Sequence, residues 1–212
     1  MEKRKIPDAV LNLLGAAITL CAVLEYFTGK PDALGSIGTG CFRYFTTDSN
    51  VLAAIACAAV FICRLKGGKL PKPVLLLKFT GTVAVTVTLL TVVFFLGPTS
   101  YLKSGWPGYM RMFEGNTLVL HLIMPLLCLI SLLTCERERI SFRESLWALL
   151  PTAVYAVVYF IAVWILKAWP DFYGFTFGGK AYMVPVSGAA MLGLTLGLAC
   201  LLRRLMSRKE KA

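Results

Sequence analysis

The chain contains one histidine, His121, which lies in an apolar stretch, "NTLVLHLIMPLL", that begins at Asn116. A second stretch, "FRYFTTDSN", places Thr46 among polar residues just before another long apolar run. A threonine hydroxyl becomes a nucleophile when a base removes its proton, and a neutral imidazole suits that task near neutral pH. Thr46 and His121 are therefore candidates for a nucleophile and its base.

Thr47, directly after Thr46, is a close rival as the nucleophile. An activated hydroxyl of this kind would attack an ester carbonyl, form an acyl-threonine and release the acyl group to water. Ser49 and Asn50 are candidate donors to the oxyanion, because side chains commonly fill that role. Since the candidates adjoin long apolar runs, we expect a lipid-like ester as the substrate.

The neighbours of both candidates follow helical spacing. Four polar residues share one face of the second apolar stretch, with the candidate nucleophile at its centre: Arg43, Thr46, Ser49 and Asn50. Thr117 and Glu114 share the face of His121, whereas Asn116 lies to the side. Apart from Thr117 and Glu114, which are only candidates, no residue that orients the imidazole can be named.

Pro125 follows His121 by four residues and has no backbone N–H. We expect it to leave the carbonyl of His121 without its helical partner and to kink the helix, which opens a pocket beside the imidazole.

Composition predicts that these residues lie on membrane helices. The 212 residues are 58% hydrophobic and 16% charged, with a mean hydropathy of +0.73, whereas a soluble domain is about half apolar and a quarter charged. Crossing a bilayer core takes about 20 helical residues. Six runs are long enough: 7–28, 41–64, 73–97, 116–134, 143–168 and 183–203. We expect an all-α integral membrane protein, with residues 1–212 forming one domain of six transmembrane helices in one bundle.

The net charge of +11 follows the topology of such a bundle rather than indicating nucleic acid. Sixteen of the 22 lysines and arginines fall on the side of the two termini, and six on the other. The excess of positive charge on cytoplasmic loops then predicts a cell-membrane protein with both termini in the cytoplasm. Acidic lipid headgroups are the expected partners of the basic side.

This topology places Thr46 and His121 at a similar depth. Each lies five residues after the expected start of its span, which corresponds to about 8 Å below the outer boundary. They meet if the second and fourth spans are neighbours. Glu25, near the outer end of the first span, is a third candidate at similar depth.

Other parts of the chain give weaker signals. "TGTVAVTVTLLTVV" alternates like a strand, but an isolated strand cannot satisfy its backbone in lipid, so we expect a helix whose threonines bond back to carbonyls.

Ala189, Gly193 and Gly197 form a small-residue face that favours packing inside the bundle, with an oligomer as the alternative. The outer connections are rich in aromatic residues, which indicate an interfacial belt or else a lid: Trp106, Tyr109, Trp169, Phe172, Tyr173 and Tyr182.

We expect no metal and no cofactor. One histidine excludes a haem with two axial histidines, and His121 with Glu114, Glu25 or Asp48 lacks a recognisable metal-ligand spacing. The seven cysteines form no C-x-x-C pair.

The two motifs resemble those of the androgen-induced membrane protein family and its six-helix bacterial relatives. "YFTTDSN" and "NTLVLHLIMP" carry the resemblance, and Tyr44, Phe45, Thr46 and His121 match the family's motif positions. It implies an intramembrane threonine–histidine pair that hydrolyses fatty acid esters of hydroxy fatty acids. The expected asparagine one turn before the histidine is displaced to Asn116, with Thr117 in its place.

Two other classes of function stay open. Intramembrane polar residues often only stabilise packing, so a non-catalytic lipid-binding protein is one alternative. A small-molecule transporter is the other, although the centres of the six spans lack charge.

Overall fold

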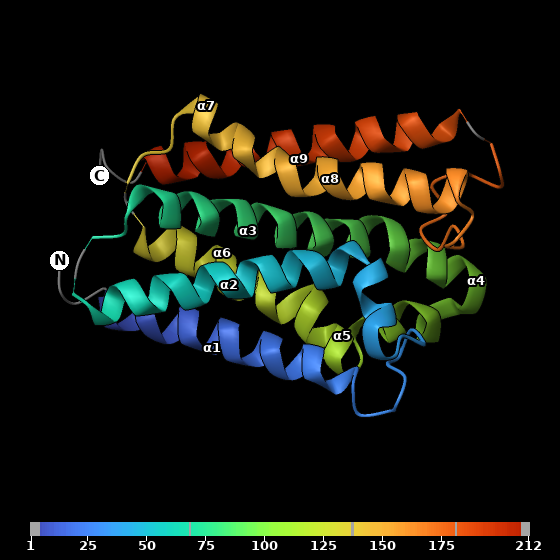
Figure 1. Cartoon of the computed structure of the whole chain (residues 1–212), viewed down its shortest axis with the longest axis horizontal. Helices are drawn as coiled ribbons and strands as arrows, with labels where there is room; N and C mark the ends of the chain where they lie inside the picture. The colour runs from blue at the N-terminus through green and yellow to red at the C-terminus, as the bar shows by residue number, and fades with distance from the viewer. Residues whose placement is uncertain (1–4, 68, 137, 181, 209–212) are drawn as a thin grey trace.

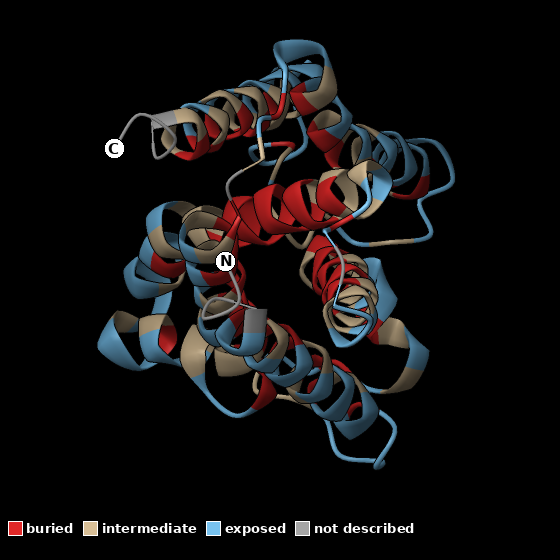
Figure 2. Cartoon of the chain, turned by 90° about the vertical axis from the view of Figure 1, so that its left-hand side faces the viewer, coloured by how far each residue is buried: buried red, intermediate tan, exposed pale blue. Residues whose placement is uncertain are grey.

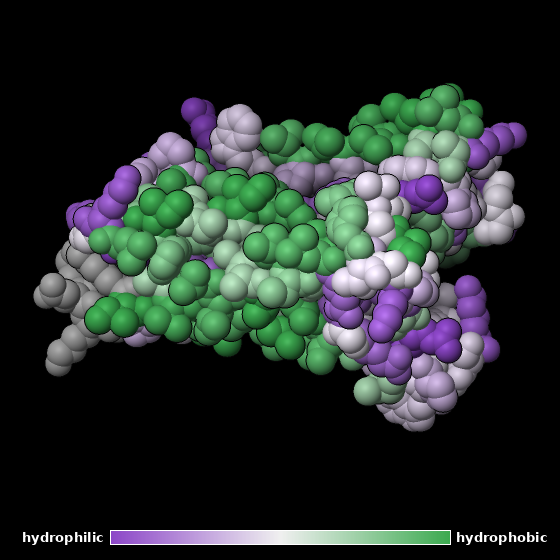
Figure 3. Space-filling model, turned by 60° about the horizontal axis from the view of Figure 1, so that its bottom comes forward, coloured by the Kyte–Doolittle hydropathy of each residue, from purple (hydrophilic) through white to green (hydrophobic). Residues whose placement is uncertain are grey.

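The fold is all-helical in the part of the chain that the structure, a computed structural model, describes: residues 5–67, 69–136, 138–180 and 182–208 (Figure 1). Six of its helical stretches are long and apolar enough to cross a membrane. They are Ile6–Glu25, Phe45–Leu65, Lys72–Phe113, Asn116–Cys135, Phe142–Ile165 and Met183–Ser207. A broad hydrophobic band covers much of the surface in Figure 3, with hydrophilic residues gathered mostly toward the ends. These features define a multi-pass membrane protein and confirm the predicted six spans.

The first three spans contain α1 (Lys5–Glu25), α2 (Phe45–Leu65) and α3 (Lys72–Thr91). A π-turn (Val92–Leu96) continues α3 into α4 (Gly97–Met110). The fourth span joins α5 (Asn116–Leu118), a π-turn (Val119–Ile123) and α6 (Met124–Cys135). The fifth joins α7 (Phe142–Ser145), a short 3-10 turn, α8 (Leu149–Phe160) and a π-turn (Ile161–Ile165), and the sixth is α9 (Met183–Arg208).

Helix α3 lies at the centre of the bundle, as the view along the helices shows (Figure 2). Eleven of its 20 residues are buried. Its threonines bond back to carbonyls one turn earlier, from Thr82 to Lys78 (2.8 Å) and from Thr86 to Thr82 (2.6 Å). The prediction of a helix despite the strand-like alternation is therefore confirmed.

Helix α1 begins and α9 ends at the same end of the bundle, which we call the terminal end (Figure 1). The segments 26–44, 97–115 and 166–180 lie at the opposite end, the loop end. All three π-turns adjoin the loop end, where the helices leave regular geometry. π-turns are frequent at functional sites.

The second span begins later than the sequence predicts. Residues Gly38–Arg43 form a 3-10 helix, Tyr44 is extended, and α2 starts at Phe45. Arg43 therefore does not belong to the polar face of α2, contrary to the prediction. Thr46 consequently lies in the first turn of α2 rather than more than one turn inside it.

Residues 98–115, which connect the third and fourth predicted spans, are largely helical, although the sequence indicated a loop there. Helix α4 consists of two pieces that fold against each other at Gly105, whose φ of +65° breaks the helix. The close approach requires glycine, because a Cβ on Gly97 would lie 2.6 Å from the Tyr109 ring and one on Gly108 would lie 2.6 Å from the Ser100 carbonyl. The sequence pattern of this segment did not predict a hairpin of two short helices.

The small-residue face of α9 points outward. Ala189, Gly193 and Gly197 are exposed, and a Cβ on either glycine would meet no atom within 4 Å. The preferred interpretation, packing inside the bundle, was therefore wrong. Helix α9 instead contacts α8 through a hydrogen bond between the hydroxyls of Thr152 and Thr195 (3.1 Å).

A buried charge cluster joins α1, α2, α3 and α6 near the terminal end. It contains Asp8, Arg64, Lys78 and Glu136, which balance as two negative and two positive charges. Lys78 contacts both carboxylates, at 2.9 Å from Asp8 and 2.8 Å from Glu136. Arg64 and Lys78 are among the sixteen basic residues counted for the membrane topology, and the sequence did not predict this cluster.

Candidate active site

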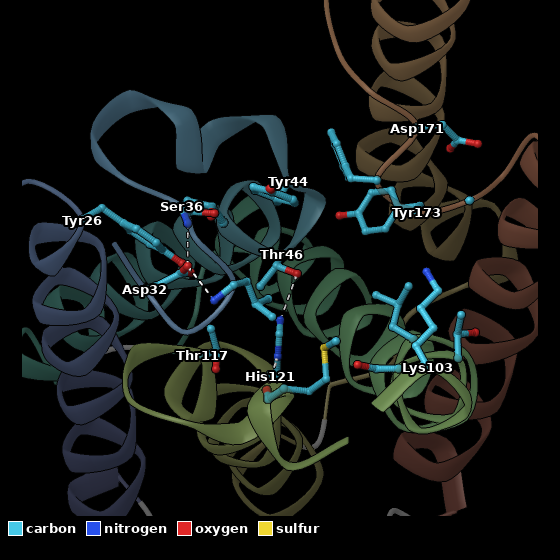
Figure 4. Close-up of a pocket in the computed structure, with 18 residues that line it drawn as sticks. Tyr26, Asp32, Ser36, Tyr44, Thr46, Lys103, Thr117, His121, Asp171 and Tyr173 are labelled. Carbon is cyan, nitrogen blue, oxygen red and sulfur yellow. Dashed lines mark hydrogen bonds between the residues drawn. The ribbon is translucent and has the colours of Figure 1, made fainter. Parts of the chain in front are cut away.

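Thr46 and His121 point toward each other across the loop end of the bundle (Figure 4). Thr46 comes from the first turn of α2, and His121 from the π-turn between α5 and α6. The Thr46 Oγ1 atom lies 3.4 Å from the His121 Nε2 atom. This is long for a hydrogen bond, but catalytic hydrogen bonds are often long without substrate and tighten when it binds.

The other ring nitrogen of His121 fixes the direction of that contact. His121 Nδ1 lies 2.6 Å from the carbonyl oxygen of Met112. Because a carbonyl can only accept, Nδ1 carries the proton in the neutral imidazole and Nε2 presents its lone pair. The Thr46 hydroxyl is therefore the donor and Nε2 the acceptor, which is the arrangement that a general base requires.

The group that orients the imidazole is thus a backbone carbonyl. It belongs to the segment between α4 and α5, nine residues before the histidine. The sequence candidates for this role lie elsewhere: Glu114 is exposed, and the Thr117 hydroxyl donates to the Glu114 carbonyl at 2.6 Å. A backbone acceptor leaves no residue-type signal by which sequence reasoning could have found it.

The π-turn around His121 explains the role of Pro125. Met124 donates its N–H to the carbonyl of Val119, five residues earlier. In this register Pro125 would pair with Leu120, so the missing N–H frees the Leu120 carbonyl rather than that of His121. Asn50 fills the gap, since its Nδ2 donates to the Leu120 carbonyl at 2.9 Å.

Asn50 therefore joins α2 to the π-turn that carries His121. Its Nδ2 also donates to the Thr46 carbonyl at 2.7 Å, and Ser49 Oγ contacts that carbonyl (3.1 Å) and the Thr88 hydroxyl (2.9 Å). Both side chains are buried and lie outside the lining of the cavity described next. The structure thus places these two predicted oxyanion donors behind the nucleophile, where they fix its backbone.

A cavity of about 310 Å³ opens beside the pair. Thr46, Thr47, Thr117 and His121 contribute to its wall, and Lys103 of α4 is the one cation among the described lining residues. His121 is 3% exposed, whereas the side chain of Thr46 is only half-buried. The candidate nucleophile is therefore more accessible from the cavity than the candidate base.

Thr47 also lines the cavity but is turned toward different partners. Its side chain is 1% exposed and contacts Tyr26 and Cys41. Burial raises the pKa of Tyr26, and the neighbouring Asp32 carboxylate raises it further. The Tyr26 phenol is thus a neutral group, and no imidazole lies beside Thr47 within the described residues.

The loop between α1 and α2 forms one side of the cavity mouth. Asp32 shapes it, because its Oδ1 atom accepts from the N–H groups of Leu34 (2.9 Å) and Ser36 (2.6 Å). The Gly38 N–H closes the loop onto the Tyr26 carbonyl (2.7 Å). Asp32, Leu34 and Ser36 of this polar loop line the cavity.

The loop between α8 and α9 forms the opposite side. Phe172 and Tyr173 line the cavity, and the Phe172 ring packs on Tyr44 with centroids 4.6 Å apart. Of the aromatic residues predicted to form a belt, these two fit the alternative of a lid. Trp106 and Tyr182 are 64% and 65% exposed, as a belt requires.

Asp171 holds this second loop in shape. It accepts hydrogen bonds from the Tyr159 hydroxyl (2.7 Å) and from the N–H groups of Phe175 (2.9 Å) and Thr176 (2.8 Å). Burial opposes ionisation of the Asp171 carboxyl, but the hydrogen bonds from Thr176 and its neighbours outweigh it and lower the pKa.

The remaining predicted site residues lie away from the cavity. Arg43 and Glu25 are exposed, and neither lines it. Asn116 is buried, and its Nδ2 donates to the Ala22 carbonyl of α1 (3.5 Å). Among the described residues, no group of three His, Cys, Asp or Glu side chains is placed to hold a metal ion.

Comparison with known proteins leaves the site to be judged on its own chemistry. No family model, no curated protein and no solved structure matches this chain.

Proposed function

We propose that the protein is an intramembrane hydrolase that cleaves a lipid ester, with Thr46 as the nucleophile and His121 as the base. One observation carries the proposal: the His121 tautomer, set by the Met112 carbonyl, directs a free lone pair at the Thr46 hydroxyl. The pair also lines a cavity of about 310 Å³, which gives a substrate access to it.

The reaction would proceed in two steps. The Thr46 oxygen attacks the ester carbonyl carbon while its proton passes to His121 Nε2. The tetrahedral intermediate expels the alcohol, whose oxygen takes that proton, and leaves an acyl-threonine. Water then attacks the acyl carbonyl, gives its proton to Nε2, and the acid leaves as the Thr46 hydroxyl is restored.

The oxyanion needs donors other than Ser49 and Asn50. In the first turn of α2, the Phe45 N–H donates to the Tyr173 hydroxyl, and the Thr47 and Asp48 N–H groups donate to the Tyr44 carbonyl. The N–H of Thr46 is the donor that remains, at a helix start where the dipole favours negative charge. Donors of this kind stabilise tetrahedral intermediates strongly in sites that exclude water, and we assign the role to the Thr46 N–H.

We infer that the loop end faces the outside of a cell membrane and that both termini are cytoplasmic. Sixteen of 22 lysines and arginines belong to the terminal side. The ester would then reach the site from the outer leaflet. The resemblance of "YFTTDSN" and "NTLVLHLIMP" to the androgen-induced membrane protein family supports a fatty acid ester of a hydroxy fatty acid as the substrate.

Ester turnover by the purified protein in lipid nanodiscs tests the proposal. Thr46→Val removes the hydroxyl at nearly constant shape, and we expect it to lower kcat by about 10³-fold, within the range that acid–base and covalent catalysis contribute. Thr47→Val is the matched control and should retain most of the activity.

Two results would change the assignment. If only Thr47→Val abolishes turnover, Thr47 is the nucleophile. If neither substitution nor His121→Gln changes turnover, the cavity serves lipid binding or transport, and the hydrolase proposal fails.

A further inference from the structure

A second, smaller cavity lies between α8 and α9, beside the candidate site. We call it the α8–α9 crevice; its volume is about 50 Å³. Thr152, Tyr155 and Tyr159 line it from α8, and Gly188 and Met191 from α9. The spacing of these residues follows one face of each helix, so the crevice runs along the helices.

The crevice and the catalytic cavity share a wall. Tyr173 lines both, and Phe45, which lines the crevice, directly precedes Thr46 in the chain. The Tyr173 hydroxyl accepts a hydrogen bond from the Phe45 N–H at 3.0 Å. Tyr173 and the start of α2 therefore form the wall between the crevice and the candidate nucleophile.

The crevice offers no free polar group to hold water. Its four hydroxyls belong to Thr152, Tyr155, Tyr159 and Tyr173. Their partners, in the same order, are the Thr195 hydroxyl, the Arg43 carbonyl, the Asp171 carboxylate and the Phe45 N–H. Because a buried water needs two to four polar partners, a space with this lining favours hydrocarbon.

We propose that the α8–α9 crevice holds a stretch of a few methylenes from one hydrocarbon chain of the ester whose carbonyl lies at Thr46. This inference rests on the proposed function and adds the place where the substrate chain binds. The outward faces of α8 and α9 are apolar and exposed, for example Val157 (58%) and Val186 (53%). A chain can therefore pass sideways from the bilayer into the crevice without crossing water.

Gly188 provides the variant that tests the crevice. A Cβ at this position meets no atom within 4 Å, so the helix tolerates a side chain that projects into free space. Gly188→Leu should fill the crevice. Because a displaced chain misplaces the ester carbonyl at Thr46, we expect kcat/KM for long chains to fall by about tenfold or more.

The assay compares p-nitrophenyl palmitate with p-nitrophenyl butyrate in nanodiscs. We expect Gly188→Leu to lower kcat/KM for palmitate and to leave butyrate nearly unchanged. Gly193→Leu is the matched control, because Gly193 is on the same helix with free space around it but does not line the crevice. An equal effect on both esters, or no effect on either, overturns the inference while Thr46-dependent turnover would still support the hydrolase.

A readout without catalysis covers the case in which the hydrolase proposal fails. A diazirine analogue of palmitate, activated by light in nanodiscs, should attach to peptides that contain Tyr155 or Met191. Gly188→Leu should reduce this labelling and Gly193→Leu should not. Labelling spread over the lipid-facing helices and unchanged by Gly188→Leu would show that the crevice holds no chain.

Discussion

His121 is oriented by a backbone carbonyl where many hydrolases use a carboxylate. The Met112 carbonyl fixes the tautomer at 2.6 Å but carries no full charge. A neutral carbonyl in this role avoids the cost of burying a further charge beside His121, which is itself buried. At the residue scale, the proposed proton transfer involves two side chains and one peptide carbonyl.

The two reactive residues should act as one unit. Thr46→Val and His121→Gln each break the same proton transfer, so we expect the double variant to be no less active than either single variant. Additive losses in kcat would instead mean that the two side chains act separately. The measurement is kcat for the three variants in nanodiscs.

The pair could be predicted from sequence because its chemistry lies in the residue types and their spacing. The orienting group could not, because a carbonyl is common to every residue. Asn50 was predicted as an oxyanion donor, whereas its amide binds the Thr46 and Leu120 carbonyls. Its partner carbonyl is free only because of a π-turn, which no sequence pattern indicated.

At the scale of single elements, the π-turn at Val119–Ile123 determines where the imidazole points. Pro125 ends its run of i→i−5 bonds, because it has no N–H for the Leu120 carbonyl, and Asn50 takes that acceptor instead. Pro125→Ala restores an N–H that would compete with Asn50 for the Leu120 carbonyl and so weaken the contact that holds the π-turn against α2. We expect turnover to fall about tenfold or more through loss of orientation, while the melting temperature stays unchanged or rises.

The control for this effect is a proline elsewhere on the chain. Pro151→Ala lies in α8, far along the chain from the imidazole, and should leave turnover nearly unchanged. A Pro125→Ala protein with full activity would show that the π-turn is not needed to orient His121.

The loop between α8 and α9 depends on the Asp171 carboxylate. Its lowered pKa means that the hydrogen bonds stabilise the loop at pH above the ordinary value of about 4 and are lost as pH falls through the lowered value. Hydrogen exchange at the Phe175 and Thr176 amides should therefore accelerate, relative to the intrinsic rate, only at strongly acidic pH. In Asp171→Asn, protection should be weaker at neutral pH and should no longer vary over that acidic range.

For the whole molecule, the buried charge cluster holds four helices together near the terminal end, opposite the end that contains Thr46 and His121. Lys78→Met would leave the Asp8 and Glu136 carboxylates short of a cation inside the bundle. Removing one partner of a buried ion pair costs about 3–5 kcal/mol. We expect a lower melting temperature in detergent.

Lys72→Met is the matched control on the same helix. Lys72 pairs with Glu144 at 3.1 Å, but its side chain is 41% exposed, and such pairs contribute about 0–1 kcal/mol. Equal melting temperatures for the two variants would contradict a stabilising role for the cluster.

The six spans and their order could be predicted because hydropathy and length suffice for membrane helices. The α4 hairpin and the charge cluster could not, for a common physical reason. Each depends on contacts between residues distant in sequence, such as Asp8 with Lys78, or on a single φ angle, as at Gly105. The outward-facing glycines of α9 show the same limit, because composition does not reveal which face a helix turns to its neighbours.

The identity of the covalently modified residue tests the central claim most directly. The purified protein is treated with a fluorophosphonate, digested and mapped by mass spectrometry. We expect one adduct, on the Thr46 oxygen, which disappears in both Thr46→Val and His121→Gln and persists in Thr47→Val. An adduct on any other residue, or labelling of Thr46 that survives His121→Gln at full rate, would contradict a threonine activated by this imidazole.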